Sequence, residues 1–233
     1  MNNILNYETY LFISSKKLII TVNTDLEKKI YYEELLVDEF HKHQNFRKLD
    51  HFLNQNIFKI EKKFNVYLKD INLIVDHANF IKIDLSLIKN FSNFPKQTDI
   101  FLNDVSNIKD SVLKTNNNYQ LIHMIINKFI DDKKNYPLLS DDNEKKNILL
   151  EVGLICLQKN IIKQLKEILS KYQISIKNIL NYEYVYSFKM KEKDCLFKVA
   201  DQLINGLNIN EIKFVQKDIK NKGFFEKFFN FFS

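Results

Sequence analysis

The sequence predicts a mixed α+β fold whose first half has an α/β character. Apolar runs rich in β-branched and aromatic residues alternate with segments whose apolar residues recur at helical spacing. Hydrophobic residues make up 45% of the 233-residue chain, which is enough for a sizeable core. The chain contains only 3 glycines and 2 prolines. This excludes collagen-like and Gly/Pro-rich disordered proteins and argues against a glycine-lined nucleotide site.

The first elements are a hairpin, a third strand and a helix. Tyr10–Val22 consists of two β-rich apolar runs separated by the polar Ser14–Lys17, which predicts a hairpin. Ile30–Val37 is a third candidate strand. Phe46–Phe64 carries apolar residues three and four positions apart, so it predicts an amphipathic helix.

Two further strands complete the first half. Ile71–Asp76 is a short and nearly continuous apolar run, typical of a buried parallel strand. Phe80–Ile88 alternates apolar and polar residues with a period of two, as a half-exposed strand does. The resulting order of three strands, a helix and two strands predicts a sheet and a helix that share one core.

A proline separates this half from a second unit. Phe94 precedes Pro95 and is therefore disfavoured in a helix. Beyond it, Phe101–Val112 predicts a helix, and Tyr119–Phe129 and Ile148–Leu157 predict strands. Asp131–Asn147, between these strands, is charged and predicts a surface loop.

The remaining elements are predicted in the same way. Lys159–Lys171 carries its apolar residues on one helical face, and Ile174–Leu180 and Tyr184–Phe188 predict closing strands. Cys195–Leu207 predicts a helix with Gly206 as its C-cap candidate.

Lysine supplies nearly all of the positive charge. The chain has 35 basic and 29 acidic residues, a formal net charge of +6, and Arg47 as its single arginine. Bidentate recognition of bases and phosphates is normally performed by arginine. The sequence also lacks a basic stretch interleaved with stacking aromatic residues. We therefore expect no nucleic-acid partner.

The cysteines and the N-terminus indicate a cytoplasmic protein. Cys156 and Cys195 stand in apolar surroundings without C-x-x-C spacing, so we expect two buried free thiols in a reducing compartment. The N-terminus has no signal-peptide pattern, and no apolar run approaches the roughly 18 residues of a spanning helix.

No residue pattern predicts catalysis. His41 and His43 lie in a polar stretch without a carboxylate or thiol at ligand spacing, so we expect surface histidines. Adjacent carboxylates such as Asp141 and Asp142 do not face one another, and we expect them to be solvated. The common nucleotide-binding, serine-hydrolase and zinc-protease motifs do not occur in the sequence. We expect a protein that is not an enzyme, with no catalytic, cofactor-binding or metal-binding residues.

The C-terminal segment 219–233 is strongly aromatic. At about 100° per residue, its phenylalanines fall within an arc of roughly 160° of a helical wheel. Such a helix would place aromatic rings among acyl chains and lysines against anionic headgroups. The alternative is a terminal helix packed on the protein's own core. The predicted membrane-binding residues are Phe224, Phe225, Phe228, Phe229, Phe231, Phe232, Lys220, Lys222 and Lys227.

The order of these elements resembles the bacterial cell-division protein family FtsA, which has an actin-like fold. Leu11–Val22 resembles the hairpin that contacts nucleotide phosphate in that family, and Ile30–Asp76 resembles the strand, helix and strand that follow. Asn103–Leu113, Tyr119–Asp131 and Asn147–Leu180 resemble the small α+β subdomain that FtsA chains insert. Within it, the dipeptide of residues 122 and 123 (Ile-His) matches the family.

The departures from the family concern the nucleotide site. Phe12–Ser15 (FISS) stands where the family has Asp and Gly beside the phosphates. Few residues follow Tyr184–Phe188, where the family continues into a second phosphate hairpin. Gly223–Phe232, by contrast, resembles the membrane-binding helix at the end of FtsA chains. The resemblance therefore implies a shortened, nucleotide-free relative without ATPase residues or a cofactor.

The resemblance also implies a domain organisation. Residues 1–95 would form part of an actin-like subdomain, and 96–188 would form the inserted subdomain. A helix and linker would occupy 189–218, and the amphipathic membrane-targeting helix would occupy 219–233.

Three functions follow from these observations. The first is an FtsA-like adaptor of the divisome that tethers FtsZ or another division protein to an anionic membrane surface, at the inner face of the cell membrane. The second is a cytoplasmic actin-like scaffold of a pilus or secretion platform. The third, a lysine-rich nucleic-acid binder, is disfavoured by the charge composition. Self-association is left open as a further contact.

Overall fold

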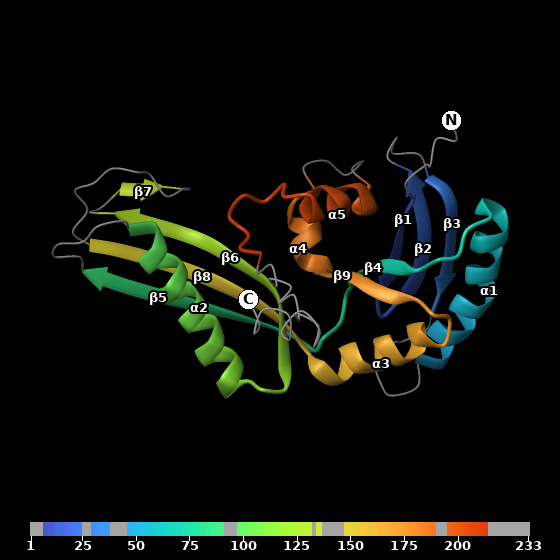
Figure 1. Ribbon diagram of the computed structural model, residues 1–233, viewed down its shortest axis with the longest axis horizontal. Helices are drawn as coiled ribbons and strands as arrows, with labels where there is room; N and C mark the ends of the chain where they lie inside the picture. Colours follow the sequence, from blue (N-terminus) through green and yellow to red (C-terminus); the bar gives the residue numbers. More distant parts are fainter. Residues whose placement is uncertain are drawn as a thin grey trace, which may run out of the picture.

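Two β-sheets lie one after the other along the long axis of the molecule (Figure 1). The computed structural model describes residues 7–24, 29–37, 46–90, 97–131, 134–136, 147–189 and 195–213. Both sheets carry helices, so the predicted α+β class is confirmed. Within these ranges, no helix combines the length and the apolar content needed to cross a bilayer.

The first sheet has five strands in the order β3-β2-β1-β4-β9. The strands β1 (Tyr7–Ile13), β2 (Lys17–Thr24) and β3 (Lys29–Leu36) form an antiparallel meander, which confirms the predicted hairpin and third strand. The strands β4 (Asp70–Val75) and β9 (Ser175–Asn181) continue the sheet parallel to β1. The predicted buried parallel strand is therefore also confirmed.

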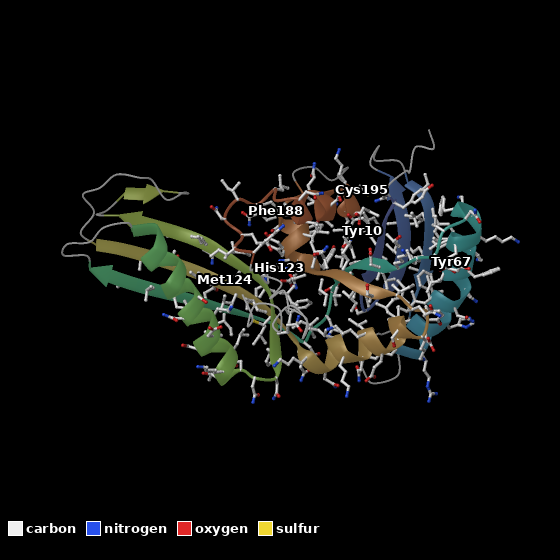
Figure 2. All side chains as sticks on the ribbon, in the orientation of Figure 1. Tyr10, Tyr67, His123, Met124, Phe188 and Cys195 are labelled. Atoms are coloured by element: carbon white, nitrogen blue, oxygen red, sulfur yellow. The ribbon has the colours of Figure 1, made fainter. Side chains whose placement is uncertain are left out.

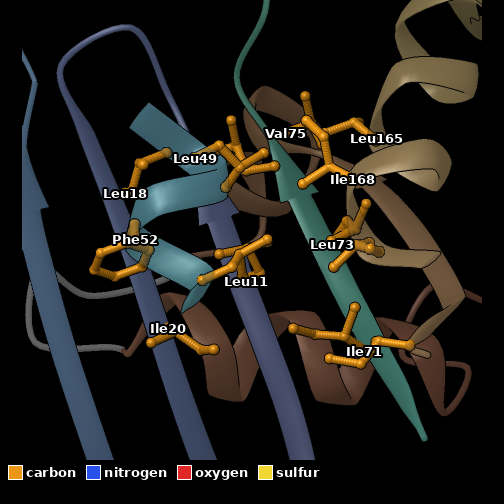
Figure 3. Close-up of a cluster of buried hydrophobic side chains, with 14 of the residues drawn as sticks. Leu11, Leu18, Ile20, Leu49, Phe52, Ile71, Leu73, Val75, Leu165 and Ile168 are labelled. Carbon is orange, nitrogen blue, oxygen red and sulfur yellow. The ribbon is translucent and has the colours of Figure 1, made fainter. Parts of the chain in front are cut away.

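Two helices cover one face of this sheet. The helices α1 (Phe46–Phe64) and α3 (Lys159–Ser170) pack their apolar residues against those of β1, β2 and β4 (Figure 3). Leu11, Leu73 and Leu49 are all fully buried in this cluster. Both helices were predicted from their apolar spacing, and α1 has the predicted bounds.

The opposite face is covered by α4 (Tyr182–Ser187) and α5 (Leu196–Ile204). The predicted strand Tyr184–Phe188 is wrong, because these residues belong to α4 and its C-cap. The Asn181 side chain accepts a hydrogen bond from the Tyr184 N–H at 2.9 Å and caps the helix. This cap and the burial of Val185 outweigh the strand preference of the aromatic and β-branched residues.

The helix α5 was predicted correctly, although it is shorter than the predicted Cys195–Leu207. Gly206 follows it with φ +94°, a left-handed conformation that glycine adopts without strain. Gly206 therefore ends the helix, as predicted.

The second sheet has four antiparallel strands in the order β5-β8-β6-β7. They are β5 (Phe80–Asn90), β6 (Tyr119–Asp131), β7 (Lys134–Tyr136) and β8 (Asn147–Gln158). The helix α2 (Gln97–Thr115) lies along one face of this sheet (Figure 1). The helix is longer than the predicted Phe101–Val112, and β7 lies within the predicted loop.

The two sheets do not divide the chain at residue 95. The strand β5 lies before that boundary but pairs with β8 over its full length, and β9 lies beyond it but pairs with β4. The alternation that predicts β5 is common to half-exposed strands, so it does not reveal which sheet the strand joins. The chain thus enters the second sheet at β5 and returns to the first through α3 and β9.

The first elements follow the order expected of a partial actin-like fold, since a hairpin, a third strand, a helix and a parallel strand precede an α+β unit. The helix α3 and the strand β9 were expected to complete the inserted subdomain, but they return to the first sheet. The predicted segment 219–233 lies outside the described residues.

Candidate functional site at the junction of the two sheets

His123 lies where the two sheets meet (Figure 2). It belongs to β6, directly after an irregularity in the pairing with β8 between Leu121 and His123. Its side chain is buried, with 4% of the residue surface exposed. A buried polar side chain requires hydrogen-bond partners, and those of His123 come from two other parts of the chain.

Both ring nitrogens of His123 are occupied. Nε2 lies 3.1 Å from the backbone N–H of Asn181, which can only donate, so Nε2 accepts. Nδ1 therefore carries the proton of the neutral ring and donates to Oε1 of Glu211 at 2.7 Å. A general base needs a nitrogen directed at its substrate, whereas His123 directs both at the protein.

Glu211 is satisfied on its second oxygen as well. Tyr184 donates its hydroxyl to Oε2 at 3.0 Å, and Asn208 donates its side-chain amide to the Tyr184 hydroxyl at 2.9 Å. The rings of His123 and Tyr184 stack at a tilt, with centroids 4.3 Å apart. The four side chains of His123, Tyr184, Asn208 and Glu211, with the backbone N–H of Asn181, form what we call the junction network.

Charge and burial act in opposite directions on Glu211. Burial opposes ionisation, but the hydrogen bonds from His123 and Tyr184 and the charge of Lys213 outweigh it, so the pKa of Glu211 is lowered. Burial and the neighbouring Glu211 raise the pKa of Tyr184. The network therefore holds an ionised Glu211 between neutral donors.

The network attaches the segment 205–213 to the second sheet. Ile126 donates its backbone N–H to the Asn210 carbonyl at 2.9 Å, and Ile212 donates to the Met124 carbonyl at 2.8 Å. These bonds flank an antiparallel bridge between Ile125 and Glu211. The segment thus acts as a short strand on the edge of β6.

A half-open groove lies beside the network. Its volume is about 410 Å³, and three apolar clusters of the described residues meet around it. Its walls combine apolar side chains with the polar side chains of His123, Asn178, Glu211 and Lys213. The groove is lined by Leu121, Ile122, His123, Met124, Asn178, Ile179, Leu180, Leu203, Ile204, Glu211, Ile212 and Lys213.

The turn between β1 and β2 is closed on itself. The hydroxyl of Ser14 accepts from the N–H groups of Lys16 and Lys17 at 3.3 and 3.1 Å, and Ser14 donates its own N–H to the Lys17 carbonyl at 3.0 Å. A phosphate cradle presents backbone N–H groups to its ligand. In this turn the N–H groups of Ser14, Lys16 and Lys17 are already paired, and Ser14 is buried.

Near this turn, the face of the first sheet that carries α4 and α5 is packed with side chains. The rings of Phe12 and Tyr182 have centroids 5.3 Å apart, so α4 packs directly on β1. Tyr10, on the same strand, donates its hydroxyl to Asp201 of α5 at 2.8 Å.

The sequence did not reveal the junction network. His123 stands between Ile122 and Met124 in an apolar strand, which is a signal that its side chain points inward, but no pattern links it to Glu211. Of the other histidines, His51 lies exposed on α1, whereas 41 and 43 lie outside the described residues. Within the described part of the chain, no group of three His, Cys, Asp or Glu side chains could hold a metal ion.

The cysteines follow the sequence prediction in part. Cys156 is a buried free thiol, and burial raises its pKa to about 11. Cys195 is also free but only half-buried. The predicted membrane-binding residues lie outside the described residues, namely Phe224, Phe225, Phe228, Phe229, Phe231, Phe232, Lys220, Lys222 and Lys227.

Comparisons with known proteins give similarity in structure and none in sequence. No protein-family model matches the chain, and no curated protein sequence matches it. A PilM–PilN type IV pilus biogenesis complex is similar to 76% of this chain with 9% identity and a TM-score of 0.44. The cytoplasmic domain of EpsL, an inner membrane component of the type II secretion system of Vibrio cholerae, is similar to 80% of it with 9% identity and a TM-score of 0.36.

The matched part is a fraction of each of these structures. The chain spans 48% of the PilM–PilN structure and 59% of the EpsL domain. An Argonaute of Marinitoga piezophila in complex with guide RNA matches 70% of the chain with 16% identity, but with a TM-score of 0.25 and over only 26% of its own length.

Proposed function

We propose that the chain is a non-enzymatic scaffold of actin-like fold that binds a membrane-associated protein partner at the inner face of the cell membrane. One observation carries the non-enzymatic part. The two places where chemistry would be sought, the Ser14 turn and the His123 ring, direct their polar groups at the protein itself. A site whose donors and acceptors are already paired is suited to holding a shape rather than to turning over a substrate.

The groove beside the junction network is the described surface best suited to the partner. Ligand sites in proteins are concave and combine apolar side chains with a few placed polar groups. This groove brings apolar side chains of both sheets together with Lys213 and the polar groups of the junction network. Three apolar clusters converge on it, so a bound apolar side chain would contact both sheets. We expect a short apolar segment of the partner to bind there.

Two cellular settings remain for this scaffold. A pilus or secretion platform is the one to test first, because the PilM–PilN complex and EpsL come from such systems. The cell-division setting rests on the element order that resembles FtsA, and no feature of the described residues is specific to FtsZ binding.

A titration with two peptides separates the settings. One peptide is the cytoplasmic segment of a single-span membrane protein encoded beside this gene, and the other is the C-terminal peptide of FtsZ. We expect the first to bind and the second not to bind, with no hydrolysis of ATP in either mixture. If only the FtsZ peptide bound, the cell-division setting would replace the pilus or secretion platform. ATP turnover by the pure chain would overturn the non-enzymatic function.

The groove itself is tested by a matched pair of variants. Ile204 lines the groove at the end of α5, and Ile204→Glu should abolish binding of the peptide. Leu207→Glu introduces the same charge three residues further along, at an exposed residue that does not line the groove, and should leave binding within about twofold. Equal loss in both variants would contradict the proposed site.

A further inference from the structure

The outer edge of the second sheet is open along β5. Figure 1 shows β5 at the side of the sheet opposite β7. Among the described residues, β8 is the only strand that pairs with β5. In an antiparallel strand every second residue then directs its backbone N–H and C=O away from the sheet, and such a row is a template for another strand.

The edge is long and regular, in contrast to the edge of β6. Proteins protect sheet edges with short strands, bulges, prolines or a covering segment. The pairing of β5 with β8 runs from Phe80 to Asn90 without a register shift. The edge of β6, by contrast, is covered by the segment around Glu211 and by β7, and β6 itself has two irregularities. None of these protections is seen on β5 in the described structure.

The side chains of β5 add an apolar row and two opposite charges. Ile81, Ile83 and Leu85 face the α2 side and are only half-buried, so they leave apolar surface beside the open edge. Lys82 and Asp84 point to the other face and are exposed. A partner strand would need apolar residues on the first face and the opposite order of charges on the second.

A second copy of β5 supplies both the apolar residues and the opposite order of charges. We propose that two copies of this chain associate through their β5 edges, as antiparallel strands centred on Ile83. In this register Ile81 faces Leu85 of the copy, and Lys82 faces Asp84 of the copy, twice by symmetry. Cross-strand pairs of opposite charge stabilise an antiparallel sheet, whereas like charges directly opposite destabilise it. The two sheets then continue into one.

The charges select this register over its neighbours. Centring the pair on Asp84 places that carboxylate opposite itself, and centring it on Leu85 places Lys82 opposite the exposed Ile88. Lys82 already contacts Glu183 at 2.6 Å, and Asn127 donates to Asp84 at 3.2 Å. Both contacts lie on the exposed face of the sheet. A strand added at the edge of β5 would therefore leave Lys82 and Asp84 paired and would bury no unpaired charge.

Charge reversal of the full-length chain tests the pairing. Sedimentation velocity over a range of concentrations should show a monomer–dimer equilibrium. Asp84→Lys and Lys82→Asp should each weaken the dimer at least tenfold, since each places like charges opposite one another twice. The double variant Lys82→Asp/Asp84→Lys restores opposite charges and should return the dissociation constant to within about threefold of the wild type. Circular dichroism checks that each variant is folded.

A crosslink tests the register independently. Residue 83 faces itself in the proposed dimer, so Ile83→Cys should form a disulfide-linked dimer on mild oxidation. Leu87→Cys lies on the same face of the same strand but would face residue 79, outside β5, and should form no disulfide-linked dimer. A wild type that stays monomeric at about 100 μM, a dimer insensitive to Asp84→Lys, or equal crosslinking at both positions would each overturn the proposal.

Discussion

His123 and Glu211 are 88 residues apart in the sequence, and their Nδ1 and Oε1 atoms lie 2.7 Å apart in the fold. The contact joins the second sheet to the last described segment of the chain, beside the N-cap of α4. Because Asn181 of the first sheet donates to the other ring nitrogen, one imidazole links three elements. The histidine therefore serves as a structural connection between the sheets.

Removal of the Glu211 carboxylate should loosen this connection. In Glu211→Ala, His123 and Tyr184 each lose the acceptor of a buried hydrogen bond, and each loss costs about 1–3 kcal/mol. We expect urea denaturation to show a matching fall in the free energy of unfolding. Amide exchange of Ile126 and Ile212 should also accelerate, because they pair across this edge.

Glu183→Ala is the matched control for that variant. Glu183 makes an exposed ion pair with Lys82, which contributes at most about 1 kcal/mol. If the two variants unfolded at the same urea concentration, the buried contact would have no special role.

Acidification should destabilise the protein through the same carboxylate. The pKa of Glu211 is lowered from 4.5 in the folded chain, so its contribution to stability is complete above that value and is lost as the pH falls through the folded pKa. Urea unfolding at pH values from 7 to about 3 measures this loss. Glu211→Gln keeps a hydrogen-bonding side chain but cannot titrate, so its stability should fall less steeply with acid. An identical slope in both proteins would exclude Glu211 as the source.

Local patterns predicted most of the elements, because each depends on a few neighbouring residues. The helix α1 follows from apolar residues at helical spacing, and the hairpin follows from polar residues at 14–17 between β-rich runs. The helix α4 was mistaken for a strand, because its aromatic residues favour strands and its stability depends on the cap from Asn181. Sheet membership of β5 and β9 was missed for a related reason, since pairing partners are not encoded in the strand itself.

The candidate site could be predicted from the sequence to a smaller extent than the helices and strands. The sequence shows that the chain lacks common catalytic motifs, but the junction network depends on contacts between residues 123, 181, 184 and 211. The Ser14 turn was predicted as a turn without glycine. Its closure by the Ser14 hydroxyl is visible only in the structure.

The two cysteines should react at different rates. Cys156 is fully buried and burial raises its pKa to about 11, so it carries almost no thiolate near pH 8 and is shielded from reagents. Cys195 is half-buried at the N-cap of α5. A thiol reagent should label Cys195 in the native chain and Cys156 only after unfolding, as mass spectrometry of the labelled peptides would show. Equal labelling of both in the native chain would contradict the described packing of β8.

The chain should not bind ATP. The backbone N–H groups of Lys16 and Lys17 are paired with the Ser14 hydroxyl, and Phe12 is packed against α4. A ligand present at 100 times its dissociation constant would stabilise the protein by about 2.7 kcal/mol. We therefore expect no shift of the melting temperature with 1 mM ATP and magnesium, a concentration (about 100-fold above a 10 μM dissociation constant) at which such a shift would be clear. A reproducible rise would contradict this prediction.

The C-terminal phenylalanines should bind membranes. We propose that residues 219–233 form the amphipathic helix predicted from the sequence. Each phenylalanine moved fully out of water contributes about 1.5–3 kcal/mol, and each lysine near an anionic surface adds about 1 kcal/mol. Phe228→Glu should therefore abolish co-sedimentation with anionic vesicles and leave the melting temperature unchanged. Asn230→Glu adds the same charge on the predicted polar face and should weaken binding only slightly. High salt should reduce binding only in part, because most of the energy is apolar. If Phe228→Glu lowered the melting temperature instead, the helix would be packed on the protein's own core.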